Sequence, residues 1–183
     1  MAIHGLRLIR TPVAVLGMAG AWHRWAPRYK FRHLEALVRR FAPDLLCAEI
    51  GRADWEAGRQ RALSPEYREC LVPLCRKLGV TIVPVDNHWP GPPSPVRLAL
   101  ALGAGPRWLN STLVDRWHRA WARLWPDATL ANQAVVERIL EAVQRDPGRR
   151  VLAAVRMERR FAVIDGLRGV DEVILLPSWP PPV

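Results

Sequence analysis

The sequence predicts a single α/β domain with a mainly parallel β-sheet flanked by helices. Short apolar runs alternate with longer segments of helical periodicity along the 183-residue chain, which is typical of strands joined by crossover helices. The run at 45–50 is almost continuously apolar, as in strands covered on both faces. Because no linker divides the pattern, we expect one domain over residues 1–183.

The first strand is expected at 13–16, where the chain is wholly apolar. Gly17 and Gly20 follow, and their backbone freedom suits a loop that bends around a site. A helix is expected at 29–41 because apolar residues recur on one face at helical spacing, namely Phe31, Leu34, Leu37, Val38 and Phe41.

The second strand, 45–50, precedes a helix expected at 64–78. Ser64 provides an N-cap and Gly79 a C-terminal stop for this helix. Pro73 lies inside it, so we expect a kink or break there.

A third strand is expected at 80–85, and a helical insertion at about 96–145 follows a proline-rich loop. The insertion contains helices at 96–102, 108–125 and 128–144. In its middle helix the apolar stripe consists of Leu113, Trp117, Ala120, Trp121 and Leu124, and the opposite face carries Arg116, Arg119 and Arg123. We expect this stripe to pack in the core; the alternative is a basic helix lying on a membrane surface.

The fourth strand is expected at 151–155, a last helix at 160–167 and a fifth strand at 173–176. The proline-rich tail, 177–183, should be extended. No apolar run approaches the roughly 20 residues needed to span a membrane.

The composition is strongly basic, with a net charge of +10 from 27 basic and 17 acidic residues. Such a surface favours anionic partners. The arginines are spread along the chain and match no known nucleic-acid motif, so nucleic acid is the least favoured partner. The three cysteines have no CxxC spacing, which suggests a reducing compartment and a cytoplasmic location.

Polar side chains follow four of the apolar runs, and parallel strands would gather them at one edge of the sheet. His23 follows the first strand. Glu49 lies within the second, where a carboxylate is costly unless it is paired or binds a cation. Asp86 and His88 follow the third strand, and Glu158 follows the fourth.

Two readings of these groups remain open. Mixed imidazole and carboxylate ligands suit Zn or Mn, so His23, Glu49, His88 and Glu158 are candidate metal ligands. A bound metal would activate water for hydrolysis, with His23, Glu49, Asp86 and Glu158 as the catalytic candidates. In the alternative, the glutamates form structural ion pairs with arginines such as Arg24 or Arg156.

The residues also resemble the TraB/Tiki/ChaN-like superfamily, which is also described as erythromycin-esterase/ChaN-like. Gly20-Ala21-Trp22-His23 resembles the family's Gly-x-x-His motif after the first strand, and Pro43-Asp44-Leu45-Leu46-Cys47-Ala48-Glu49 resembles its Pro-Asp-x-Val-x-x-Glu strand. Ala131-Asn132-Gln133-Ala134-Val135-Val136 is similar to its Arg-Asn-x-x-Met-Ala helix. Val155-Arg156-Met157-Glu158 stands where a second Gly-x-x-His is expected, so Glu158 would replace that histidine.

This resemblance implies metal-dependent proteolysis, esterase-like chemistry or haem binding. We therefore expect either a metal-dependent hydrolase or a non-enzymatic protein that binds haem or an anionic ligand in the same cleft. Asn132 and Arg156 are expected to contact the ligand, which would be a small molecule or a peptide. The sequence gives no oligomeric state.

Overall fold

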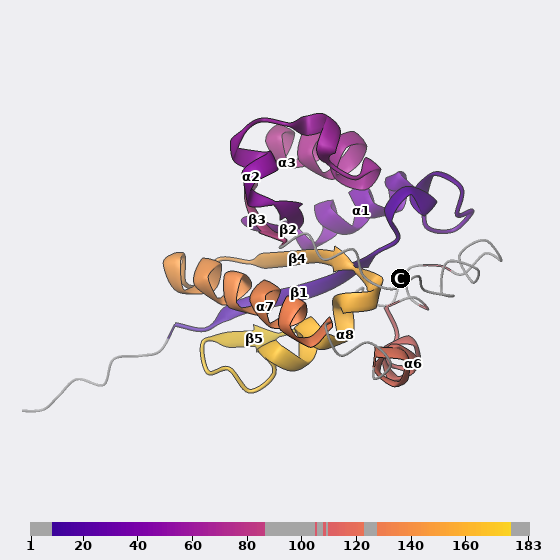
Figure 1. The fold of residues 1–183 in the computed structure, drawn as a ribbon. Coiled ribbons are helices and arrows are strands. Elements are labelled where there is room, and N and C mark those ends of the chain that lie inside the picture. Colours follow the sequence, from indigo (N-terminus) through magenta and orange to yellow (C-terminus); the bar gives the residue numbers. More distant parts are fainter. Residues whose placement is uncertain (1–8, 87–104, 106–107, 109, 123–127, 177–183) are drawn as a thin grey trace, which may run out of the picture.

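A computed structural model describes residues 9–86, 105, 108, 110–122 and 128–176 of the chain (Figure 1). These residues contain one parallel sheet with the strand order β3-β2-β4-β1-β5. The strands are β1 (Thr11–Met18), β2 (Leu45–Gly51), β3 (Thr81–Asp86), β4 (Val151–Arg156) and β5 (Val173–Leu175). The predicted α/β class and parallel sheet are confirmed.

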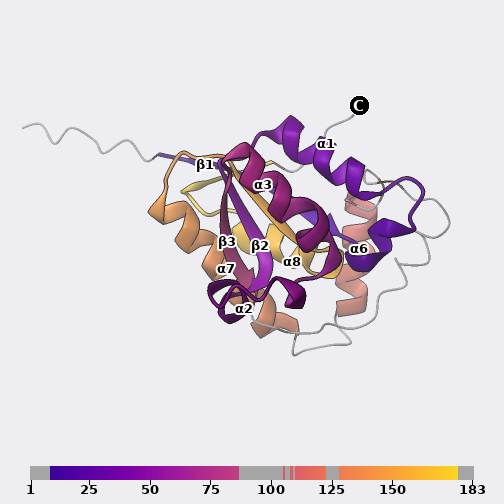
Figure 2. The same cartoon turned by 90° about the horizontal axis from the view of Figure 1, so that it is seen from above.

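Helices cover both faces of the sheet. Helices α1 (Phe31–Phe41) and α3 (Val72–Leu78) lie on one face, and α7 (Ala128–Arg145) and α8 (Met157–Leu167) lie on the other (Figures 1 and 2). The alternation of strand side chains separates two apolar cores: Leu16 packs with α1 and α3, whereas Val15 packs with α7 and α8.

The chain leaves β1 and β4 in opposite directions, although these strands are neighbours. From β1 it passes through α1 to β2, and from β4 it passes through α8, on the other face, to β5. Loops that diverge in this way leave a switch point at the carboxyl ends of the strands, where α/β proteins commonly bind ligands. The turn η1 (Gly20–Arg24) and helix α6 (Thr112–Ala122) lie at this end of the sheet (Figure 1).

Two helices differ in detail from the sequence prediction. Helix α8 begins at Met157 rather than near 160, so its first turn contains Glu158, Arg159 and Arg160. The predicted helix 64–78 changes to a π-helical turn, η3 (Tyr67–Leu71), immediately before α3. This change of pitch confirms the break expected near Pro73, and Gly79 ends the helix at φ 70° as predicted.

The prediction for α6 was wrong about which face is buried. Its buried side chains are Val114, Asp115 and His118, whereas Leu113 and Trp117 are exposed. The cause is an ion pair: Asp115 is buried because it bonds to the buried side chain of Arg160. Ala120 is also exposed, and the side chains of Trp121 and Leu124 lie outside the described set, as do the predicted helix 96–102 and the tail 177–183.

Candidate functional site

A tyrosine hydroxyl opens the sheet between β2 and β4 at the carboxyl end. The backbone N–H of Glu49 donates to Oη of Tyr67 over 3.0 Å, and this hydroxyl donates to the carbonyl oxygen of Ala154 over 2.7 Å. Tyr67 therefore takes the place of a direct ladder bond, just beyond the last paired residues of the two strands. The inserted hydroxyl separates the strand ends where the side chains of Glu49 and Arg156 meet.

The carboxylate of Glu49 is held by two arginines and by the start of α8. Its Oε2 accepts a hydrogen bond from the backbone N–H of Arg156. Its Oε1 lies 2.6 Å from Nε of Arg156 and 3.1 Å from Nη1 of Arg159. The side chains of Glu49 and Arg159 are 2% and 1% exposed, whereas that of Arg156 is 28% exposed. Two guanidinium groups thus bond to one carboxylate, and only the side chain of Arg156 is partly exposed to solvent.

In the part of the chain that the structure describes, Glu66 and Asn132 each have a buried side-chain oxygen without a partner, and Glu66 lies near Glu49. Burial raises the pKa of Glu66, and the negative charge of Glu49 adds to that rise. Among the described residues, Oε2 of Glu66 and Oδ1 of Asn132 have no hydrogen-bond partner. Because buried polar atoms are nearly always hydrogen-bonded, these oxygens mark positions for water or ligand groups.

Polar side chains bond to the backbone of β1 beyond the point where β5 ends. Strand β5 pairs only with the first three residues of β1. The N–H of Gly17 donates to Oδ1 of Asn110 over 2.7 Å, and its carbonyl accepts from the Tyr29 hydroxyl over 2.8 Å. The carbonyl of Val15 accepts from Nε of Arg160 over 3.2 Å. Three polar side chains thus bond to the edge of β1 that β5 leaves open.

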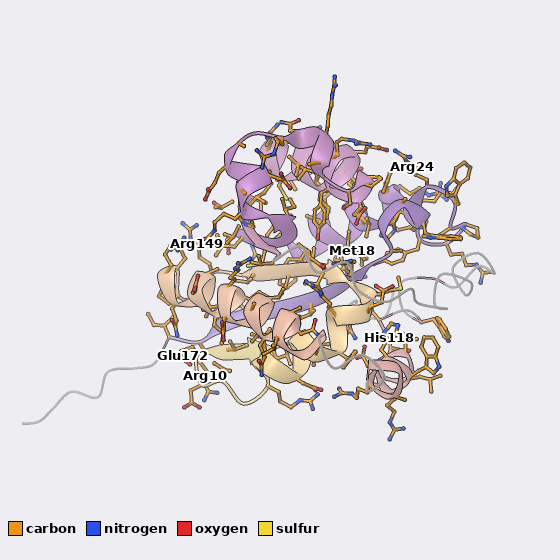
Figure 3. The ribbon with its side chains drawn as sticks, viewed as in Figure 1. Arg10, Met18, Arg24, His118, Arg149 and Glu172 are labelled. Atoms are coloured by element: carbon orange, nitrogen blue, oxygen red, sulfur yellow. The ribbon has the colours of Figure 1, made fainter. Side chains whose placement is uncertain are left out.

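A buried ion pair fastens α6 to α8. Nη1 of Arg160 lies 2.7 and 2.6 Å from the two carboxylate oxygens of Asp115, and both side chains are nearly inaccessible. His118, one turn further along α6, hydrogen-bonds to the backbone of Met157. Figure 3 shows Met18 and His118 at this end of the molecule, whereas Arg10, Arg149 and Glu172 lie at the opposite end.

His23 is fully buried, and both of its ring nitrogens are engaged. Nε2 accepts from the N–H of Ala19 over 2.9 Å, and Nδ1 lies 2.7 Å from the carbonyl oxygen of Tyr29, to which it donates. Burial lowers its pKa to about 4, so the ring is neutral at physiological pH. Neither nitrogen offers a lone pair to a metal ion, so His23 does not fit the ligand role expected from the sequence.

Among the described residues, the remaining candidates are not grouped as a metal site. Glu158 lies half-buried in the first turn of α8, and Asp86 ends β3, where its backbone pairs with Gly51. His88 lies outside the described residues. Within the described part of the chain, no three His, Cys, Asp or Glu side chains are grouped to hold an ion. Because Glu49 is bonded to arginines and His23 to backbone groups, the candidates that the structure describes do not fit Zn or Mn.

The ion pair between Glu49 and Arg156 is the structural alternative that the sequence left open, and it is present. Arg24 pairs instead with Glu69. Sequence reasoning missed the part played by Arg159, although its place just after a buried strand was a usable signal. It also missed Tyr67, because nothing in a sequence shows that a tyrosine will reach across a sheet.

These features define a three-layer α/β protein with an arginine–glutamate cluster at the carboxyl edge of its parallel sheet. Comparison of the chain with protein-family models, curated proteins and solved structures finds no match. Across the described residues, no helix has both the length and the apolar character needed to cross a membrane.

Proposed function

We propose that the chain is a non-enzymatic binding protein for a small ligand that carries a carboxylate or phosphate group. The observation that carries this proposal is the pairing of two arginines with one buried carboxylate: Arg156 and Arg159 both bond to Glu49 at the N-terminus of α8. Guanidinium groups are the preferred partners of carboxylates and phosphates in proteins.

The exposed part of Arg156 is the entry point for such a ligand. Its Nε is fixed by Glu49, so the guanidinium is oriented before the ligand arrives, which lowers the entropic cost of binding. Burial favours the uncharged form of Glu66, which reduces its repulsion of an anion. The unpartnered Oε2 of Glu66 supports the proposal, since Glu66 interacts with the charges of Glu49 and Arg156 and this oxygen can bind a donor group of the ligand or a bridging water. Contact of Asn132 with the ligand stays a prediction.

Titration calorimetry with inorganic phosphate, and separately with citrate, tests this proposal. Chloride at the same ionic strength provides the baseline. We expect one of the two anions to bind, and Arg156→Gln to weaken that binding about tenfold or more, as for loss of a charge-assisted hydrogen bond. Arg168→Gln is the matched control, because this side chain is 66% exposed and pairs with Asp165 at the surface.

Three outcomes would overturn the proposal. The first is equal anion binding by the wild-type protein and Arg156→Gln, or none by either. The second is stoichiometric Zn or Mn in protein purified without an affinity tag, which would favour the hypothesis of a metal-dependent hydrolase instead. The third is an absorbance band that appears on haem titration and that Arg156→Gln retains, because such a band would indicate a haem-binding protein instead.

A further inference from the structure

Helix α6 buries two polar side chains and exposes two large apolar ones. Asp115 is 7% exposed and His118 is 2% exposed, because they bond to Arg160 and to the backbone of Met157. In contrast, Leu113 is 63% exposed and Trp117 is 40% exposed. The two apolar residues are four positions apart, so they lie on the same face of the helix.

The exposed apolar surface extends beyond α6. Trp108, just before the helix, is 44% exposed, and Trp25 in the segment after β1 is 77% exposed. These segments are close together, since a Cβ added at Gly105 would lie 3.7 Å from Cβ of Arg28. Leu113 and Trp117 thus form an exposed apolar pair on α6, and the segments next to it carry two further exposed tryptophans, as is typical of an interaction surface.

Exposed arginines lie beside this surface among the described residues. Arg116 is exposed on α6 next to Trp117, and Arg28 is exposed beside the segment that leads into the helix. The acidic residue of α6, Asp115, is buried and neutralised by Arg160. The whole chain carries a net charge of +10, so a second copy would be repelled and an anionic partner attracted.

We propose that the exposed face of α6 docks onto an anionic lipid bilayer. Tryptophan settles at the level of the lipid headgroups, leucine enters the acyl boundary and arginine binds headgroup phosphates. The buried Asp115–Arg160 pair supports this arrangement, because it holds α6 with Leu113 and Trp117 facing outwards. The helix would lie on the membrane and would not cross it. This inference is independent of the proposed anion site.

Vesicle co-sedimentation of the full chain tests the proposal. The vesicles consist of phosphatidylcholine alone or of phosphatidylcholine mixed with phosphatidylglycerol. We expect binding to the mixed vesicles only, weakening as salt is added. The double variant Leu113→Ser/Trp117→Ser should lower the partition coefficient more than about tenfold. Arg116→Gln should lower it about fivefold.

Matched controls lie at the opposite end of the sheet. Leu78→Ser changes a leucine that is 40% exposed at the end of α3, and Arg145→Gln changes an exposed arginine at the end of α7. Both should leave vesicle binding unchanged. Circular dichroism and thermal melting check that each variant folds, which we expect because all the changed side chains are exposed.

The proposal fails if the wild-type protein does not bind mixed vesicles, or if Leu113→Ser/Trp117→Ser binds them equally well. It also fails if sedimentation velocity shows that the wild-type protein is a dimer and the double variant a monomer, because the face would then join two copies of the chain. Binding of a mixed-sequence single-stranded oligonucleotide without vesicle binding would assign the face to nucleic acid and overturn the proposal.

Discussion

Oη of Tyr67 donates to the carbonyl oxygen of Ala154 over 2.7 Å, and the same Oη accepts a hydrogen bond from the N–H of Glu49 over 3.0 Å. One side-chain atom therefore satisfies a backbone donor and a backbone acceptor on neighbouring strands. The separation of β2 and β4, and with it the site around Glu49, depends on this contact.

Tyr67→Phe should therefore destabilise the protein. The change leaves the N–H of Glu49 and the carbonyl of Ala154 buried without this partner, at a cost of about 1–3 kcal/mol in the free energy of unfolding. Denaturant unfolding measures this cost. A loss below about 0.3 kcal/mol would mean that the strands close and re-form a direct bond.

Glu49→Gln should be more damaging, because it leaves two guanidinium groups without their shared carboxylate. Removal of one partner from a buried ion pair costs about 3–5 kcal/mol. Glu35→Gln is the control: Glu35 pairs with Arg39 along α1, and both side chains are more than 40% exposed. That change should cost less than about 0.5 kcal/mol. Equal losses in the two variants would contradict a buried, energetically coupled cluster.

Acid should destabilise the fold through its buried histidines. Burial lowers the pKa of His23 and of His118 from 6.5 to about 4. As the pH falls from 6.5 towards 4, these histidines become protonated in the unfolded chain but stay neutral in the folded chain. Each histidine therefore lowers the free energy of unfolding by up to about 1.4 kcal/mol per pH unit in that window, and the loss is absent above pH 6.5.

Unfolding experiments at about pH 7.5, 6 and 5 measure this slope. His118→Gln should remove roughly half of the histidine contribution, since one of the two groups remains. Glu66 acts in the opposite direction, because burial raises its pKa and the folded state takes up its proton first. A slope that is unchanged in His118→Gln would show that this histidine is protonated in the folded state.

Gly166 and Val136 allow α8 and α7 to pack closely. A Cβ added at Gly166 would lie 2.7 Å from Cγ2 of Val136, which is too close without movement. Gly166→Ala should therefore destabilise the protein by about 1–3 kcal/mol. A Val136→Ala background removes both Cγ atoms and leaves only Cβ of residue 136, at 3.3 Å, so the same change should cost at least about 1 kcal/mol less there. A double-mutant cycle by denaturant unfolding measures this coupling, and equal costs in the two backgrounds would contradict it.

The sequence was sufficient to predict the order of strands and helices along the chain, because period and composition report local structure. Continuous apolar runs marked the parallel strands, and Ser64 and Gly79 marked the ends of one helical segment. Pro73 correctly indicated a change in that helix. The strand order in space was not predicted, since it depends on which apolar faces meet.

The site was predictable only in part, because burial of a polar residue does not reveal its partner. Glu49 was recognised as costly, and pairing with Arg156 was one of the two readings. His23 follows β1 as expected, but the chain turns its ring inward to backbone groups. For α6, hydrophobic periodicity favoured the wrong face, because pairing of Asp115 with Arg160 places the polar side inward.

The side chains of Asn110, Tyr29 and Arg160 beside β1 also bear on how copies of this chain meet in concentrated solution. An open strand edge is a template for the strand of another molecule and a common start of aggregation. Here the backbone groups of Val15 and Gly17 are already bonded on that side. At the other edge, β3 contains Pro84, which has no N–H to donate. The carboxyl half of β1 and the outer edge of β3 are thereby less able to pair with a strand of another copy and to start a fibril.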